Sequence, residues 1–382
     1  MYFRIPRLEQ AWNRFFIRTL RRLMPAAPAE NPDWGAKPHR VLYLRYDKIG
    51  DMILSTSLID AIAASHPTIT LDVLASPANA PILAGNPLVS AVRIWDKSKP
   101  LKYAQLIREL RKARYDAVID CMILAPSTTT LLLMLASGAR HRIGVGGGIN
   151  DFALTVRIPA STTAVHHIEH SSVLATAFGV KLDSVDWKPR LTLSVSEIEQ
   201  AEQRWKSQDT MTPTGRARRL LVNVSAGRPM RQWPEQRFIE LLEHIRKSGA
   251  KLNMLLICAP ADIERAKRIA KQSGVTRAPT PHLRDALALV ETTDLVFTPD
   301  TSIGHAASAC GKPAVILYEH GNERLWGGYR IGGRNVVSDD MTLATLPVEP
   351  VIEAVDELIS TDWNADGTIR GKVRTEGDRR DR

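Results

Sequence analysis

Short apolar runs alternate along the chain with longer stretches in which apolar residues recur every three to four positions. The short runs predict buried strands, and the longer period predicts amphipathic helices. In the first half of the chain, this pattern predicts strands at 41–45, 69–75, 91–95 and 117–120, and helices at 52–65 and 103–113. Strands that alternate with helices favour a parallel, doubly wound sheet.

The alternation restarts after a polar stretch at 194–219, whose first half predicts a helix and whose second half predicts an interdomain linker. Beyond it, the pattern predicts strands at 220–225, 252–258, 294–298 and 314–318, and helices at 234–248, 261–272, 302–310 and 347–359. The fold class is therefore α/β, with two Rossmann-like doubly wound domains facing a cleft. Ligands of such sheets bind beyond the carboxyl ends of the strands.

The ends of the chain differ in composition from this body. Residues 25–38 are rich in Pro and Ala and predict a linker, whereas the residues from 362 onward are charged, almost without apolar side chains, and predict disorder. The expected segments are a basic helix with its linker (1–37), a first domain (38–195) and an interdomain helix and linker (196–219). A second domain (220–361) and a disordered tail (362–382) follow.

The composition is that of a globular protein. Of the 382 residues, 44% are apolar and 24% are charged, which excludes a disordered chain and a disulfide scaffold. The three cysteines lie far apart without a CxxC pair, which disfavours structural zinc and fits a reducing cytosol. The longest apolar candidate, 131–136, is much shorter than the 18 or more residues of a membrane span.

The net charge of +10 is uneven along the chain. Residues 1–24 hold six arginines against Glu9, which gives +5, half of the total. Aromatic and leucine residues in this segment recur at helical spacing, opposite the arginines: Trp12, Phe15, Phe16, Leu20 and Leu23. Such a helix either docks on an anionic membrane surface or packs on the protein body. Nucleic acid is a weaker alternative, because the basic residues are not interleaved along a long stretch.

A first group of candidate residues follows the first predicted strand, in the segment 45–51. Gly50 permits a tight turn, and Asp51 begins the next helix at the carboxyl edge of the sheet. Asp51 is either a general base or the N-cap of the helix. Dinucleotide binding is not supported, because no GxGxxG motif is present here.

A second group, 298–305, follows a strand and opens a helix whose small and hydroxyl residues leave backbone N–H groups free for an anion. Asp300 is the expected N-cap, and His305, one turn in, either packs or reaches a ligand. In the loop 225–234, Arg228 or Arg231 either clamps a phosphate or belongs to a solvated loop.

Three histidines and a glutamate cluster at 165–170, where a polar helix start is favoured over a metal site. The spacing is not HExxH, and the chain contains no DxD pair.

With these motifs, the chain resembles glycosyltransferase family 9, the bacterial ADP-heptose:lipopolysaccharide heptosyltransferases and their relatives. The resemblance covers about 41–359. It rests on Arg45, Gly50 and Asp51 in an RxxxxGD pattern and on five further segments, which are 77–87, 166–169, 231–234, 300–305 and 311–315. Two positions depart from the family pattern. Arg231 stands where the family usually has Lys, and Ser302 stands where it usually has Gly.

The resemblance implies a GT-B fold, with the acceptor on the first domain and the nucleotide-sugar on the second. It implies inverting transfer without a metal or other cofactor, with Asp51 as the catalytic base. The implied donor-diphosphate residues are Arg231, Asp300, Thr301, Ser302, Ile303, Gly304 and His305, with Asp262 a candidate for the ribose. Arg45, Lys48, Gly50 and His166 are candidates for the acceptor side.

The expected function is therefore transfer of a sugar, with heptose from ADP-heptose favoured, to lipopolysaccharide or another lipid-linked glycan. The expected location is the cytoplasm, with peripheral contact to the inner face of the membrane. The alternatives are a nucleotide-sugar-binding protein without turnover and a sugar-nucleotide epimerase on the same fold.

Overall fold

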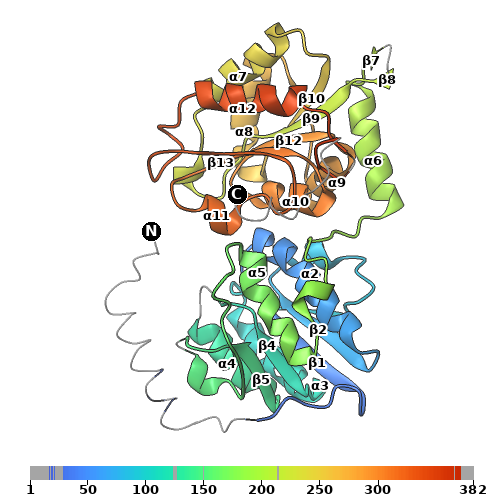
Figure 1. Ribbon diagram of the computed structural model, residues 1–382, viewed down its shortest axis with the longest axis vertical. Coiled ribbons are helices and arrows are strands. Elements are labelled where there is room, and N and C mark those ends of the chain that lie inside the picture. The colour runs from blue at the N-terminus through green and yellow to red at the C-terminus, as the bar shows by residue number, and fades with distance from the viewer. Residues whose placement is uncertain are drawn as a thin grey trace. The chain divides into compact units, whose positions relative to one another are not determined.

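A computed structural model describes residues 17, 19, 21, 29–123, 127–148, 150–212, 215–364 and 366–370. The chain divides into two compact units, unit 1 (Met1–Trp187) and unit 2 (Lys188–Arg382). Each unit contains a six-stranded parallel sheet with helices packed around it (Figure 1). Both sheets have the strand order 3-2-1-4-5-6 when the six strands of each sheet are numbered in chain order, which is the order of Rossmann folds.

Unit 1 is built around its first strand, β1. Its sheet has the order β3-β2-β1-β4-β5-β6. The strands are β1 His39–Leu44, β2 Ile69–Ala75, β3 Ala91–Ile94, β4 Ala117–Asp120, β5 His141–Val145 and β6 Val156–Ile158. The helices are α2 Ile49–Ser65, α3 Tyr103–Ala113, α4 Thr128–Ser137 and α5 His167–Ser172, with short 3₁₀ turns that include η1 Ala80–Leu83 and η4 Val173–Phe178.

Helix α2 is buried over most of its first ten residues, because its own side chains are mostly small or apolar on every face of the helix. Gly50 lies in its first turn and is buried there, so the tight turn expected at this glycine is replaced by helix. This brings the helix start, and with it Asp51, directly to the end of β1.

Residues 29–37 belong to unit 1 and do not form the linker expected from their composition. Trp34 is buried, its Nε1 donates to the Ala177 carbonyl at 2.7 Å, and its ring stacks on Phe178 at 4.4 Å. The Ala29 amide donates to the Thr155 carbonyl at 2.9 Å. The predicted basic helix lies outside the described residues, apart from residues 17, 19 and 21, which are helical.

Unit 2 repeats the plan with the sheet order β11-β10-β9-β12-β13-β14. The strands are β9 Arg218–Asn223, β10 Leu252–Ile257, β11 Thr276–Arg277, β12 Leu295–Pro299, β13 Ala314–Tyr318 and β14 Gly333–Val337, with a separate hairpin of β7 Met211–Thr212 and β8 Gly215–Arg216. The helices are α6 Val195–Lys206, α7 Glu235–Lys247, α8 Ile263–Ser273, α9 Leu283–Thr292, α10 Ser302–Cys310, α11 Glu323–Trp326 and α12 Glu349–Ser360. An apolar core that includes Trp233, Phe238 and Phe297 packs these helices on the sheet.

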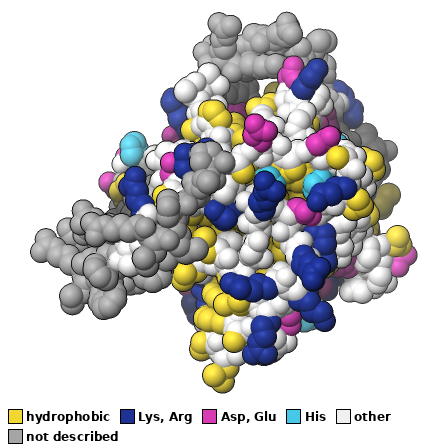
Figure 2. Space-filling model, turned by 90° about the horizontal axis from the view of Figure 1, so that it is seen from below, with side chains coloured by type: hydrophobic (Ala, Val, Ile, Leu, Met, Phe, Trp, Pro, Cys, Tyr) yellow, Lys and Arg dark blue, Asp and Glu magenta, His cyan; other side chains and the backbone are white. Residues whose placement is uncertain are grey.

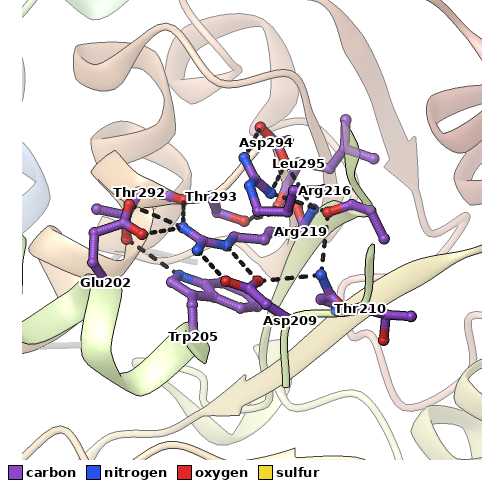
Figure 3. A network of polar contacts seen from close by, with 12 residues as sticks. Glu202, Trp205, Asp209, Thr210, Arg216, Arg219, Thr292, Thr293, Asp294 and Leu295 are labelled. Carbon is purple, nitrogen blue, oxygen red and sulfur yellow. Dashed lines mark hydrogen bonds and ion pairs between the residues drawn. The ribbon is translucent and has the colours of Figure 1, made fainter. Parts of the chain in front are cut away.

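The predicted interdomain helix and linker at 196–219 are part of unit 2, and the border between the units lies at 187–188 instead of 195–196. Helix α6 packs against α9. The buried Arg219 of β9 donates to Glu202 of α6 at 2.9 Å and to Asp209 at 2.7 Å, and it lies over the Trp205 ring (Figure 3). This network ties the polar stretch to the amino end of β9, so it cannot act as a free linker.

The prediction of a disordered tail is wrong for 362–364 and 366–370. Trp363 pairs with Ile369 in an antiparallel bridge, and the Gly332 amide donates to the Gly367 carbonyl at 2.8 Å. A Cβ at Gly332 would lie 2.0 Å from the Trp363 ring, so only glycine permits this approach. Trp363 packs against the core of unit 2 and anchors a segment that is otherwise polar. Residues 371–382 lie outside the described part of the chain.

Candidate active site

The first set of candidate residues lies at the carboxyl edge of the sheet of unit 1. Strand β1 pairs with β2 on one side and with β4 on the other, so the chain leaves β1 at the point where the strand order reverses. Ligands of doubly wound sheets bind at this point. The structure places the segment 45–51 there, as the sequence predicts.

Asp51 is the residue of this segment with the clearest chemical signature. It is the third residue of α2 and is 6% exposed. The N-cap of the helix is Lys48, so Asp51 is not the capping residue. Burial, followed by repulsion from Asp47, raises the pKa of Asp51 from 3.8 to about 7 against the opposing effect of Arg45. A carboxyl group with a pKa near 7 is suited to accept a proton at neutral pH.

Arg45, a candidate for the acceptor side, is instead buried beneath this segment. Its Nε donates to Ser55 Oγ at 2.9 Å, and its Nη1 lies 3.3 Å from Asp47 Oδ2. Ser55 Oγ in turn donates to the Asp51 carbonyl at 2.8 Å. The pKa of Arg45 lies above its ordinary value, because Asp47, Cys121 and other neighbours outweigh the lowering effect of burial. Arg45 therefore ties Asp47 to helix α2.

The other acceptor-side candidates differ in exposure. Lys48 is exposed, whereas Gly50 is buried in α2. His166 is the N-cap of α5, a helix that packs against α2. Its Nδ1 accepts from the Ile168 amide at 3.2 Å, while Glu169 accepts from the His166 amide at 3.3 Å. The histidine cluster is thus the polar helix start that the sequence favours. Among the residues that the structure describes, no group of three His, Cys, Asp or Glu side chains is placed to hold a metal ion.

The second set lies at the corresponding edge of unit 2, between β9 and β12, where that strand order reverses. The N-cap of α10 is Thr301 and not Asp300, the residue predicted for that role; Thr301 Oγ1 accepts from the Ile303 amide at 3.3 Å. Asn223, at the end of β9, donates to Thr301 Oγ1 at 3.1 Å and to Thr298 Oγ1 at 3.0 Å. These bonds fix the turn that precedes α10.

Within the turn, Ser302 is partly exposed, and the residues that follow it are buried. The Gly304 amide donates to the Thr301 carbonyl at 3.1 Å. A Cβ on Gly304 would lie 3.0 Å from Ile316 Cδ1, so the glycine lets α10 lie close to β13. His305 is 6% exposed, with its ring 6.3 Å from that of Trp326. The helix begins at the sheet edge, so its dipole favours an anion there.

Arg231 comes to the same edge from the loop after β9, but two carboxylates already hold it. Its Nη1 lies 2.6 Å from Asp300 Oδ2, and its Nε donates to Glu319 Oε1 at 2.7 Å. Asp300 is 4% exposed and Glu319 is 2% exposed. Burial of the Tyr318 side chain, followed by the nearby Asp300, raises the pKa of Tyr318 well above its usual value. The cluster thus places one guanidinium between two buried acidic side chains.

Glu319 is the residue of this cluster that the sequence reasoning missed. The available signal was its place directly after the predicted strand 314–318, at the same edge as Asp300. Asp262, the ribose candidate, lies at this edge too, after β10; it is partly exposed and accepts from Gln232 Nε2 at 3.4 Å.

Comparison with known proteins identifies the chain. The model of the family described as glycosyltransferase family 9 (heptosyltransferase) matches residues 103–346. The chain belongs to glycosyltransferase family 9. It is therefore an enzyme that transfers a sugar, as the resemblance in its motifs implies. Lipopolysaccharide heptosyltransferase 3 of Escherichia coli K12 is 25% identical to this family 9 chain over 353 residues, covering 82% of the chain and 96% of the relative. Lipopolysaccharide heptosyltransferase 2 of the same strain is 23% identical, covering 73% and 82%.

Solved structures of family 9 proteins share the fold. The glycosyl transferase family 9 protein from Veillonella parvula superposes with a TM-score of 0.73 at 18% identity, covering 87% of this chain and 99% of the other. The ADP-heptose lipopolysaccharide heptosyltransferase II of E. coli gives a TM-score of 0.65 at 21% identity, covering 84% and 98%. These likenesses, with the two Rossmann-like sheets, confirm the GT-B plan for this family 9 enzyme.

Proposed function

We propose that this family 9 enzyme transfers heptose from ADP-heptose to a lipopolysaccharide acceptor, with inversion at the anomeric carbon. The proposal draws on the curated relatives, which are lipopolysaccharide heptosyltransferases, and on a solved E. coli heptosyltransferase with ADP-2-deoxy-2-fluoro heptose, which shares the fold at a TM-score of 0.62. The observation that carries the mechanism is the buried Asp51 carboxyl, whose pKa of about 7 suits a base at neutral pH.

In the proposed reaction, the carboxylate of Asp51 takes the proton of an acceptor hydroxyl. The hydroxyl oxygen attacks the anomeric carbon of the donor sugar from the face opposite the diphosphate, and the bond between that carbon and the diphosphate oxygen breaks. A single displacement of this kind inverts the configuration. Lys48, which is exposed three residues before Asp51, is the remaining acceptor-side candidate whose side chain reaches solvent.

The diphosphate of the donor is assigned to unit 2, at the segment 300–305, with Asp262 near the ribose. The positive end of the α10 dipole and the Arg231 guanidinium stabilise the charge that develops on the leaving group. The proposal assigns no step to a metal ion or cofactor. Ser302, which replaces the usual glycine, is partly exposed at the first position of α10, so its side chain has room beside the bound phosphate.

An anionic surface is the proposed partner of the basic N-terminal segment 1–24, which would place the enzyme at the cytoplasmic face of a membrane near lipid-linked acceptors. Figure 2 shows Lys and Arg side chains spread over the described face of the protein seen from below, with Asp and Glu more sparse among them. Within the described residues, no helix is both long and apolar enough to cross a membrane. Loss of vesicle binding on removal of 1–24 supports this placement, whereas equal co-sedimentation with anionic vesicles contradicts it.

The decisive experiment measures ADP release from ADP-heptose with heptose-free lipopolysaccharide as acceptor. Asp51→Asn is expected to lower turnover about 10²- to 10⁴-fold, the usual size of a general-base effect, with little change in ADP-heptose affinity by calorimetry. Asp183→Asn removes an exposed carboxylate from the same unit and is the matched control. Near-normal turnover by Asp51→Asn removes this residue from the mechanism. Binding of ADP-heptose without transfer to this acceptor by the unmodified protein contradicts the proposed acceptor.

A further inference from the structure

We propose that the segment 95–103 of unit 1 is a lipid-docking loop: the Leu101 side chain enters an anionic phospholipid bilayer, and the lysines beside it contact the lipid headgroups. This contact is separate from the one proposed for residues 1–24. Neither the family resemblance nor the sequence pattern assigns a role to this loop.

Leu101 is the most exposed large apolar side chain among the residues that the structure describes. It lies in a short 3₁₀ turn, η2 Pro100–Lys102, between β3 and α3, and is 97% exposed. A single exposed leucine is common on soluble proteins and by itself indicates nothing. What distinguishes Leu101 is its surroundings, which are a fixed loop, an apolar pocket and a concentration of positive charge.

Side-chain contacts fix the conformation of the loop at both ends. Asp96 Oδ1 accepts from the Ser98 amide at 3.0 Å and from Ser98 Oγ at 2.6 Å. The Tyr103 hydroxyl donates to the Lys97 carbonyl at 3.0 Å, and the Tyr103 ring stacks on Trp95 at 4.1 Å. The tip of the loop is therefore held away from the body of unit 1.

A pocket of about 460 Å³, with mostly apolar walls, lies beside the loop. Its lining includes Pro81, Ile94, Trp95, Tyr103, Lys99 and Lys102. Trp95 is 8% exposed, and no described residue accepts a hydrogen bond from its Nε1. Apolar walls with one buried indole donor suit the part of a lipid where the acyl chain joins its ester groups, the depth that tryptophan favours in membranes.

The charge around the loop complements an anionic surface. Residues 95–114 hold seven Lys and Arg side chains against Asp96 and Glu109, which gives +5, half of the net charge of the chain. The apolar face of α3 is buried, whereas its basic residues are exposed, as are the lysines of the loop: Lys97, Lys99, Lys102, Arg108, Arg111 and Lys112. Cations at such positions are attracted to anionic headgroups.

The exposed leucine among lysines favours a bilayer over a soluble polyanion. A nucleic acid would neutralise the lysines but would offer no apolar surroundings for Leu101. At a bilayer surface, an apolar side chain enters the boundary between headgroups and acyl chains, while lysine ammonium groups remain among the headgroups.

The loop lies at the same edge of the sheet as Asp51. It follows the carboxyl end of β3, and the pocket wall that contains Pro81 follows the carboxyl end of β2. Asn79, in that wall segment, donates through Nδ2 to the Arg45 carbonyl at 3.1 Å, which ties the pocket to the segment 45–51. Docking through the loop would bring this edge to a bilayer that holds lipid-linked molecules.

The first test follows the loop directly and needs neither donor nor acceptor. The full chain with Leu101→Cys is labelled with an environment-sensitive NBD fluorophore and mixed with phosphatidylcholine vesicles that contain or lack phosphatidylglycerol. Val195→Cys, at an exposed apolar position of unit 2, is the matched control, and the unmodified chain treated with the same reagent corrects for the native cysteines. Because Leu101 is almost fully exposed, its replacement should leave the fold unchanged.

The fluorophore at position 101 should brighten severalfold and shift to shorter wavelength with phosphatidylglycerol vesicles, and brominated acyl chains should quench it. The fluorophore at position 195 should not respond. Three results overturn the proposal: unchanged emission at position 101 while the protein sediments with the vesicles, an equal response at position 195, and no sedimentation with the vesicles at all.

The second test measures co-sedimentation of the full chain with the same vesicles. Leu101→Ser should weaken binding about tenfold, because an apolar side chain no longer leaves water. Lys99→Ser combined with Lys102→Ser should weaken it about tenfold at low salt and much less at high salt, where screening removes the attraction. Lys206→Ser combined with Lys251→Ser removes two exposed charges from unit 2 and should have little effect.

Unchanged binding by Leu101→Ser, or equal weakening by the two pairs of lysine substitutions, overturns the loop as the contact. Both tests are independent of the proposed function. Absence of heptose transfer by a protein whose position 101 enters the bilayer removes the proposed reaction and leaves the docking loop, whereas transfer without entry of position 101 does the reverse.

Discussion

Replacement of Asp51 by Asn should stabilise the protein at alkaline pH and leave its stability almost unchanged at acidic pH. Asn has nearly the shape of a protonated Asp, so the substitution removes the titration and keeps the packing. The raised pKa of Asp51 means that the folded state binds its proton more tightly than the unfolded chain does. The stability that this proton contributes is complete below pH 3.8 and is lost as the pH rises through about 7.

The size of the effect follows from the shift. Each unit of pKa corresponds to 1.36 kcal/mol, so the change from 3.8 to about 7 sets an upper limit of about 4 kcal/mol. Part of the shift arises from Asp47, and some of that repulsion persists in a partly compact unfolded chain. We therefore expect a gain of roughly 2–4 kcal/mol for Asp51→Asn at pH 8.5.

Urea unfolding of the unmodified protein and of Asp51→Asn, at pH 5.0 and pH 8.5, measures this gain. The difference between the two proteins should grow with pH and should reach its full value above pH 8. Asp183→Asn serves as the control for the loss of one negative charge, because its carboxylate is exposed. If the free energies of unfolding of the unmodified protein and Asp51→Asn depend on pH in parallel, then the pKa of Asp51 is not raised. Such a result would remove the support for Asp51 as the base.

The remaining predictions concern the arginine cluster of unit 2. Arg231→Ala should weaken ADP binding about tenfold or more and should also destabilise unit 2, because Asp300 and Glu319 lose their buried counterion. Calorimetry measures the ADP affinity, and an unchanged affinity would mean that Arg231 has a structural role alone. Glu319→Gln keeps the shape of the side chain but removes one negative charge beside Arg231, so ADP affinity should rise severalfold as that charge no longer opposes the diphosphate. Weaker ADP binding by Glu319→Gln would instead mean that Glu319 acts mainly by orienting the guanidinium.

Much of the fold follows from local pattern. The predicted strand at 69–75 and the predicted helices at 103–113 and 302–310 coincide with β2, α3 and α10. The later strands of unit 1, β5 and β6, and helix α4 are not predicted by the pattern of apolar residues. Strand β6 has only three residues, and α4 contains the uniformly apolar run 131–136. A strand this short or a helix this uniformly apolar shows no periodic pattern of apolar and polar residues, so the sequence does not reveal it.

The positions of the candidate residues in the fold follow from the sequence, whereas their contacts follow only in part. Asp51 and the segment 300–305 lie at the expected sheet edges, because the carboxyl ends of parallel strands are recognisable from the order of elements. The prediction that Asp300 caps α10 is wrong, since Thr301 takes that role and Asp300 pairs with Arg231. The position of a cap depends on which side chain the backbone turns toward the first amides, and several polar residues in this turn were compatible with that role.

The sequence by itself determined the two doubly wound sheets, the family, and the loops that contain the candidate site residues. The spacing of apolar residues and of motifs can be recognised locally along the chain. The tertiary structure alone decided how deeply Asp51 is buried and that Arg231 meets Glu319, 88 residues away. It also decided that Trp363 anchors the segment after α12 against Gly332. Burial and the distance between charges arise only when remote segments pack together, and these two quantities set the proton affinity of the proposed base and the charge of the proposed donor site.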